Sequence, residues 1–271
     1  MNNSNIIGVF TFSNKPEFCT VEKSDVIFLC HYSENGDLIN EVYLGSETFR
    51  EGFISRDQDF IYHIGDTIGT YSFDSRKIKN SSTEFDVEKI GSLAGEFFFQ
   101  RQNGEIVISE QVIKTFPPSI LSTYLNLGLS DHEGDLCLFD ENFDVKGKSY
   151  MDSLGAVCVK WNKESVIVGE SRGPLKCYDL KKFESKNEYP SQDGWNFLEI
   201  GLVTKDAVIV LSKDFETMSL GKVERIVNWQ EKEELFTIID APLYLKFSKD
   251  VIIGSNRLFY DGLTGEEIGN F

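Results

Sequence analysis

The stretch KDVIIGSNRLFYDGLTGEEIG, residues 249–269, decides the fold. It contains an apolar run, a second run that ends in the aromatic and acidic pair Tyr260-Asp261, a turn with glycine, and a third run. Short runs rich in Val, Ile, Phe and Tyr, bounded by Gly, Asn, Asp and Ser, are typical of β-strands. The stretch therefore predicts three consecutive strands, paired antiparallel through short turns.

The same order of runs recurs through the chain and can be followed by its marker pair. Four further markers are Tyr32-Ser33, Phe73-Asp74, Phe139-Asp140 and Tyr178-Asp179. The second residues of the five pairs are separated by 41, 66, 39 and 82 residues. The last interval is twice 41, and its midpoint falls near FETMSLG (215–221), which we interpret as the same strand position with a degraded marker. A period of about 40 residues is that of a four-stranded propeller blade.

The interval of 66 residues is too long for one blade and too short for two. It contains GEIVISEQVIKTF (104–116), which we interpret as a trimmed blade. Counting this segment predicts seven blades, and leaving it out predicts six. We expect an all-β fold: one β-propeller domain over residues 1–271 with about seven four-stranded blades, and six as the alternative.

The copies resemble the degenerate repeats of WD40-like and quinoprotein-like propellers, whose blades often carry a strand that ends in an aromatic residue and Asp. The Trp-Asp dipeptide, the Gly-His pair and repeated tryptophans of those families are absent. The resemblance implies a fold and no particular activity.

Local signals refine the expected blades. Asn35-Gly36 and Asn103-Gly104 lie between apolar runs and predict hairpins with type I′ turns, in which both central residues have positive φ. The marker aspartate is expected to close the following turn by accepting hydrogen bonds from backbone N–H groups. NIIGVFTF (5–12) is expected to pair with EEIGNF (266–271), so that both termini belong to one sheet.

Composition narrows the classes of partner. Acidic side chains number 44 and basic ones 27, which gives a formal net charge of −17. Such a charge repels nucleic acid and anionic membranes and attracts basic proteins. The segment Met1–Ile7 has no Lys or Arg and leads into a short apolar run, so we expect no secretion signal and a cytoplasmic protein. The five cysteines lack CxxC spacing and are expected to be buried, reduced thiols.

Residues with catalytic or metal-binding chemistry are sparse. The histidines His31, His63 and His132 lie in separate copies without metal-ligand spacing, and no GxSxG elbow is present. We therefore assign no catalytic residue, no metal ligand and no cofactor. The segment SDHEGDLCLFDENFD (130–144) places Asp131, Glu133 and Asp135 at alternate positions, as a solvated acidic turn or as a site for Ca²⁺ or a basic partner.

The connection LKKFESKNEYPSQDG (180–194) is the longest polar segment, and Trp195 follows it. Loops that join propeller blades often carry binding residues, and amphipathic aromatic side chains are frequent anchors. We therefore predict a contact patch at Tyr189, Asp193 and Trp195. The alternative is that Trp195 begins a core strand.

These features favour binding over catalysis. The first hypothesis is a monomeric, non-enzymatic propeller that binds a basic protein, in its sharper form a bacterial immunity protein that neutralises a basic toxin. Nucleic acid and membranes are not expected as partners. The alternative is a propeller-type hydrolase or lyase, with carboxylates or a metal converging in the channel from several blades.

Overall fold

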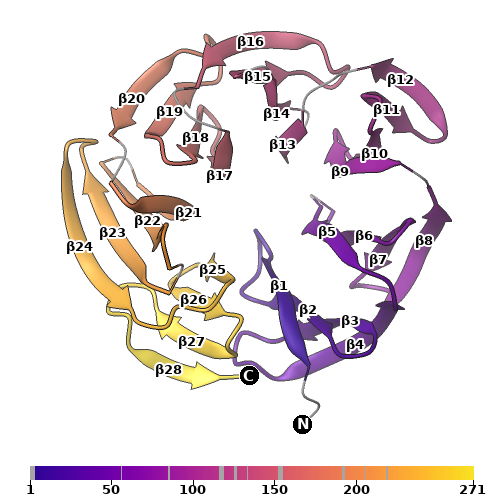
Figure 1. Cartoon of the computed structure of the whole chain (residues 1–271), viewed down its shortest axis with the longest axis horizontal. Coiled ribbons are helices and arrows are strands. Elements are labelled where there is room, and N and C mark those ends of the chain that lie inside the picture. The colour runs from indigo at the N-terminus through magenta and orange to yellow at the C-terminus, as the bar shows by residue number, and fades with distance from the viewer. Residues whose placement is uncertain are drawn as a thin grey trace. The chain divides into compact units, whose positions relative to one another are not determined.

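The computed structural model describes residues 4–55, 57–84, 86–115, 119–124, 127–132, 134–151, 155–190, 193–204, 206–217 and 219–271. In this part of the chain the strands form seven four-stranded antiparallel sheets, and there is no helix (Figure 1). Each sheet is built from four consecutive strands, as in a propeller blade. The all-β prediction is confirmed, with seven blades and not six. No described helix is long and apolar enough to cross a membrane.

The blades follow one another along the chain. The first contains β1 (Asn5–Thr11), β2 (Phe18–Lys23), β3 (Ile27–Tyr32) and β4 (Leu38–Gly45). The second contains β5 (Phe49–Ile54), β6 (Asp59–Ile64), β7 (Thr67–Ser72) and β8 (Lys77–Thr83). The third contains β9 (Val87–Leu93), β10 (Glu96–Arg101), β11 (Glu105–Ile108) and β12 (Gln111–Thr115). The fourth contains β13 (Ser119–Tyr124), β14 (Leu127–His132), β15 (Asp135–Phe139) and β16 (Val145–Tyr150).

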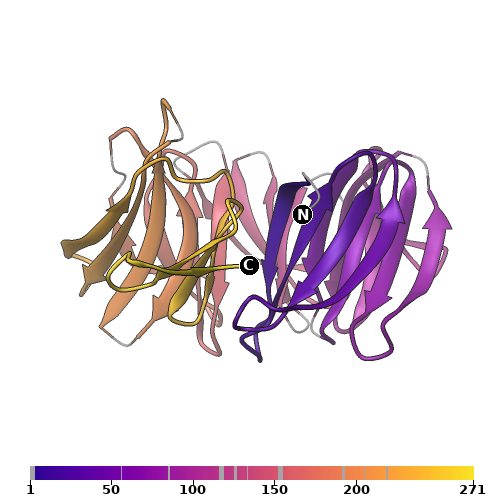
Figure 2. The same ribbon diagram turned by 90° about the horizontal axis from the view of Figure 1, so that it is seen from below.

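The last three blades have the same make-up. The fifth contains β17 (Ala156–Trp161), β18 (Ser165–Glu170), β19 (Leu175–Asp179) and β20 (Ser185–Tyr189). The sixth contains β21 (Trp195–Val203), β22 (Ala207–Asp214), β23 (Gly221–Val227) and β24 (Glu231–Ile238). The seventh contains β25 (Leu245–Ser248), β26 (Val251–Gly254), β27 (Leu258–Asp261) and β28 (Glu267–Asn270). Within each blade the strands lie side by side and twist (Figure 2).

The chain divides into two compact units. Unit 1 comprises residues 1–24, 29–41 and 151–271, and unit 2 comprises residues 25–28 and 42–150. In unit 1, apolar side chains of neighbouring blades form continuous clusters, one of which contains Val210 of β22 together with Ile167 of β18. In unit 2, Ile61 of β6 packs in the same way with Phe99 of β10. Burial between neighbouring sheets therefore supplies the core of each unit.

The five marker pairs all lie at the end of the third strand of their blades or directly after it, so the three predicted runs are the second to fourth strands and each blade begins one strand earlier. The predicted trimmed blade is complete, because residues 104–116 contribute both β11 and β12. The interpretation of FETMSLG was wrong: this segment joins β22 to β23, and the third strand of its blade ends at Val227. A turn of Asn228 and Trp229, both with positive φ, replaces the expected aromatic and acidic pair there.

The predicted role of the marker aspartates is confirmed in three blades. One carboxylate oxygen of Asp140, Asp179 or Asp261 accepts two backbone N–H groups of the following turn. The donors are Asn142 and Asp144 at 2.9 and 3.0 Å, Lys181 and Lys182 at 2.7 and 3.1 Å, and Leu263 and Thr264 at 2.9 and 2.8 Å. Hydrogen bonds from Lys146 and Lys186, assisted by these N–H groups, lower the pKa of Asp140 and of Asp179 to about 2. These aspartates therefore hold turns together.

Both predicted hairpins are present, but their turn type differs from the prediction. Gly36 and Gly104 have φ of 85° and 86°, whereas Asn35 and Asn103 are not among the residues with positive φ. The connections are longer than the two residues of a type I′ hairpin, and Gly104 N–H donates to the Arg101 carbonyl at 2.8 Å. In such longer loops only the glycine needs the left-handed region.

The predicted pairing of the two terminal strands is wrong. β1 pairs with β2 and β28 pairs with β27, because each blade takes its four strands from one continuous segment. Side chains link the termini within unit 1 instead. The Phe271 ring lies 4.9 Å from that of Phe18 and 5.0 Å from that of Tyr32, measured between centroids. Arg257 forms an ion pair with the buried carboxylate of Glu22.

Candidate binding surface

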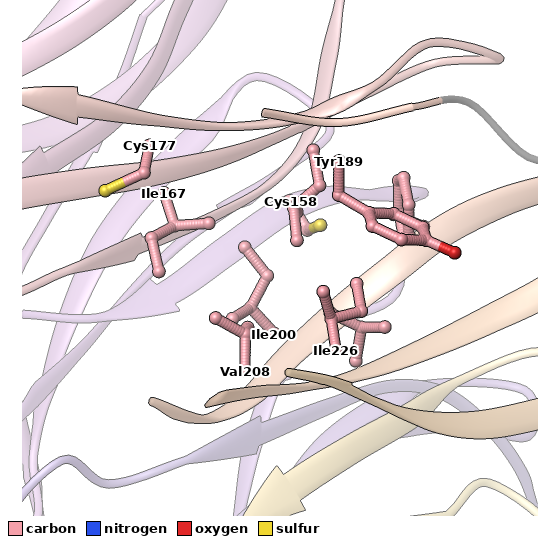
Figure 3. Close-up of a cluster of buried hydrophobic side chains, with 10 residues drawn as sticks. Cys158, Ile167, Cys177, Tyr189, Ile200, Val208 and Ile226 are labelled. Carbon is pink, nitrogen blue, oxygen red and sulfur yellow. The ribbon is translucent and has the colours of Figure 1, made fainter. Parts of the chain in front are cut away.

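The connection predicted over residues 180–194 is shorter than expected. Ser185–Tyr189 forms β20, the fourth strand of its blade. Its sequence SKNEY is polar because four of its five residues are exposed, so it was not predicted as a strand. The Tyr189 side chain is 7% exposed and packs with Cys158 and Ile226 in the core between the fifth and sixth blades (Figure 3). Its expected place in an exposed contact patch is thus corrected, since a buried ring offers no surface to a partner.

Asp193 and Trp195 lie at the start of the sixth blade. Asp193 is exposed, and Trp195 is half-buried as the first residue of β21, so the alternative that it begins a strand is confirmed. The Lys222 ammonium lies 4.1 Å from the Trp195 ring centroid, and both Lys222 and Lys232 lie 3.2 Å from the buried carboxylate of Glu224. Desolvation lowers the pKa of Lys222, while Glu224 opposes that effect. Trp195 therefore covers a buried charge cluster.

The acidic segment 130–144 is only partly described. Glu133 and the side chain of Asp131 lie outside the described residues, so their predicted binding role stays a prediction. The Asp135 carboxylate lies 3.6 Å from the Lys148 ammonium, and that of Asp140 lies 2.8 Å from Lys146. Among the described residues, no group of three or more His, Cys, Asp or Glu side chains could hold a metal ion.

The five cysteines, His31 and His63 are buried, and the side chain of His132 lies outside the described residues. All five cysteines are buried and free, as predicted, and burial raises the pKa of the Cys158 thiol to about 12. His31 Nε2 lies 2.7 Å from a carboxylate oxygen of Glu17. His63 is 1% exposed, and burial lowers its pKa. None of these side chains is presented on the surface for catalysis.

Unit 2 contains an open pocket of about 310 Å³ between the first strands of the second, third and fourth blades. Its lining residues are Glu51, Gly52, Phe53, Ile54, Lys89, Ile90, Gly91, Ser122 and Thr123. One oxygen of Glu51 accepts the Ile90 N–H at 2.8 Å, and the other lies 4.0 Å from the Lys89 ammonium. Burial raises the pKa of Glu51. The pocket offers one carboxylate and one ammonium group to a small polar molecule.

A surface of a different kind lies at one end of the blades in unit 1. We call it the loop face and define it as residues 171–174, 193–194, 215–217, 219–220, 239–244 and 255–257. Because consecutive strands alternate in direction, the connections that contribute to it all leave their blades at the same end.

Backbone hydrogen bonds join these connections into one surface. Phe215 N–H donates to the Gly194 carbonyl at 2.8 Å, and Ala241 N–H donates to the Ser219 carbonyl at 2.7 Å. Ser255 N–H donates to the Tyr244 carbonyl at 2.9 Å. The connections from 193–194 to 255–257 are therefore each held by the next, which limits their conformational freedom.

Large apolar side chains point into solvent from the loop face. The exposed fractions are 75% for Ile239, 59% for Leu243, 40% for Phe215, 37% for Leu220 and 36% for Tyr244. These five residues lie on two connections that the Ala241–Ser219 hydrogen bond joins, whereas the exposed apolar side chains of a soluble protein are commonly scattered singly. Apolar patches of this kind mark sites of interaction.

Solved structures similar to this chain cover nearly all of it. U3-55K is 14% identical with a TM-score of 0.67, and the match covers 94% of this chain and 89% of that one. The C-terminal WD40 domain of Sif2 is 13% identical with a TM-score of 0.67, over 95% and 82% of the two chains. BamB from Moraxella catarrhalis is 8% identical with a TM-score of 0.63, over 100% and 90%.

The chain has the fold of these β-propellers. The predicted resemblance to degenerate propeller repeats is thereby confirmed, and at such low identity the likeness shows the fold alone. No protein-family model matches the sequence, and no curated protein does.

Sequence reasoning missed most of the loop face of this propeller. Only Asp193 was predicted from it, because the exposed apolar residues are divided between two connections that β23 and β24 separate in the sequence. The sequence signal that could have identified them is the segment 239–244, in which Ile239, Leu243 and Tyr244 are apolar although connections between strands are usually polar.

Proposed function

We propose that this β-propeller is a non-enzymatic protein-binding module. The observation that carries the proposal is the loop face, where five large apolar side chains are exposed on loops that hydrogen bonds hold in place. Folding gains nothing from exposing these side chains, whereas a partner would bury them.

In its sharper form, the proposal is that the module is a bacterial immunity protein. It would act in the cytoplasm, remain monomeric until it binds, and neutralise a basic toxin by covering the toxin's functional surface. The net charge of −17 supports this form, because it accelerates encounter with a basic protein and disfavours nucleic acid.

Affinity capture with the full-length chain tests the function. Extract from the native cells is passed over the immobilised protein at moderate salt, bound proteins are identified, and toxicity is measured when a captured protein is expressed with and without this chain. A basic protein that is released at high salt and loses its toxicity in the presence of the chain supports the proposal. If no protein is captured above the background of a mock column, the binding function is refuted. If a captured protein stays toxic in the complex, the immunity form is refuted.

The pocket of unit 2 favours one second candidate, a propeller-type hydrolase or lyase. The Glu51 carboxyl, with its raised pKa, is the group suited to proton transfer there. Screening the purified protein with ester, lactone and glycoside substrates tests this candidate. Turnover that is lost in Glu51→Gln and kept in the exposed variant Glu96→Gln would support it, and absence of turnover would refute it.

A further inference from the structure

We propose that the loop face binds a basic segment of the partner in which apolar side chains are flanked by Lys or Arg. This inference rests on the proposed protein-binding function and adds the surface and the chemistry of the bound segment. Leu243 and Ile239 are the main anchors, and three carboxylates beside them select the charge.

The apolar contribution comes mainly from the connection between β24 and β25. Ile239 and Leu243 are more than half exposed, and Tyr244 beside them combines an apolar ring with a hydroxyl group. Phe215 and Leu220 extend the surface across the neighbouring connection. Covering such side chains removes apolar surface from water, which favours binding.

The charges on the loop face favour a cationic partner. Asp193, Glu216 and Asp240 are exposed. Among the residues that define the loop face, the basic ones are Arg172 and Arg257. Arg257 is paired with Glu22, so the charge of Arg172, whose guanidinium carbon lies 3.3 Å from the Phe215 ring centroid, stands against three carboxylates. A Lys or Arg of the partner would therefore meet carboxylates at the edge of the apolar surface, while an acidic segment would be repelled.

The buried Lys213 prepares this surface for binding. Its side chain is 1% exposed, and its ammonium donates to the carbonyls of Ala241 at 3.3 Å and Pro242 at 2.5 Å. These carbonyls belong to the connection that carries both main anchors. Because the connection is ordered before the partner arrives, binding loses less conformational entropy.

Selection from a phage-displayed library of random peptides tests the inference. The library is selected on the immobilised full-length chain, and enriched peptides are measured against Leu243→Asp and a control, Leu263→Asp. Leu263 is 49% exposed in the turn between β27 and β28, at the opposite end of its blade. Both variants add one charge at an exposed leucine, and their unfolding midpoints should match that of the wild type.

The inference predicts enriched peptides with Lys or Arg beside apolar residues. Leu243→Asp should weaken their binding at least about tenfold, and Leu263→Asp by less than about twofold. Enriched peptides that are acidic, or that bind Leu243→Asp as well as wild type, would overturn the assignment of the loop face but leave the binding function standing. If no peptide is enriched, the proposed chemistry of the bound segment is wrong. The capture experiment from native cells still tests the binding function independently.

Discussion

Replacing Arg257 by Met removes the cation that neutralises a buried carboxylate between the first and last blades. The Glu22 side chain is 6% exposed and the Arg257 side chain 33%. Glu22 also accepts hydrogen bonds from Tyr32 OH at 2.8 Å and Thr20 Oγ1 at 2.9 Å. Removing one partner of a buried ion pair costs about 3–5 kcal/mol. Solvent screening at the partly exposed arginine reduces the expected loss to about 2–3 kcal/mol.

The dependence on pH distinguishes this cause from a loss of packing. In the wild type, burial opposes ionisation of Glu22, but hydrogen bonds from Arg257, Ser4, Tyr32 and Thr20 outweigh it and lower the pKa. The pair therefore stabilises the fold above the pKa of the unfolded carboxyl, and this contribution is lost as the pH falls through the folded pKa. In Arg257→Met burial is less opposed, and the pKa of Glu22 should rise. Protonation of Glu22 at mildly acidic pH then removes the buried charge that has lost its arginine partner.

Urea unfolding of wild type and Arg257→Met at pH 7 and pH 4.5 measures the effect. The difference in unfolding free energy should be about 2–3 kcal/mol at pH 7 and clearly smaller at pH 4.5. Arg225→Met is the matched control, because Arg225 pairs with Glu233 on the surface, and it should cost less than about 1 kcal/mol. An equal difference at both pH values, or a loss no larger than that of the control, would refute the reasoning.

Three further predictions follow from other contacts. Deleting Phe271, whose ring packs on three aromatic rings, should lower stability by about 1–3 kcal/mol, and an unchanged thermal midpoint would contradict it. Lys213→Met should speed amide hydrogen exchange at residues 239–244, while the free energy of unfolding stays within about 1 kcal/mol of wild type because Met removes a buried charge along with its hydrogen bonds; unchanged exchange would count against it. Asp179→Ala should lower the midpoint at pH 7, with the deficit disappearing as the pH falls towards 2, where the wild-type carboxyl is itself protonated; a deficit independent of pH would show a different cause.

The strands and turns followed from the sequence because their causes are local. Apolar runs of four to eight residues between polar breaks have few alternatives to strands, and an aspartate at a strand end satisfies the next N–H groups without help from elsewhere. Asp140 and Asp179 could thus be assigned correctly from their neighbours. The sixth blade lacks the marker pair, because Asn228 and Trp229, both with positive φ, form the turn after its third strand.

Which side chains are exposed depends on contacts between blades, and the sequence does not show these contacts. Tyr189 follows four polar residues and looks like part of a loop, yet the strands of the next blade bury its ring. The terminal strands have sequences suited to pairing, but each pairs within its own blade. Arg257 and Phe271 instead contact side chains of β2 and β3.

The sequence by itself determined the all-β class, the repeated blade, the turn aspartates and the acidic charge, because each depends on residues close together or on composition. Tertiary structure alone decided which apolar side chains face solvent. Ile239, Leu243 and Phe215 share one face because the hydrogen bond between Ala241 and Ser219 joins two connections that β23 and β24 separate in the sequence. That surface depends on how neighbouring blades pack, which a one-dimensional pattern does not specify.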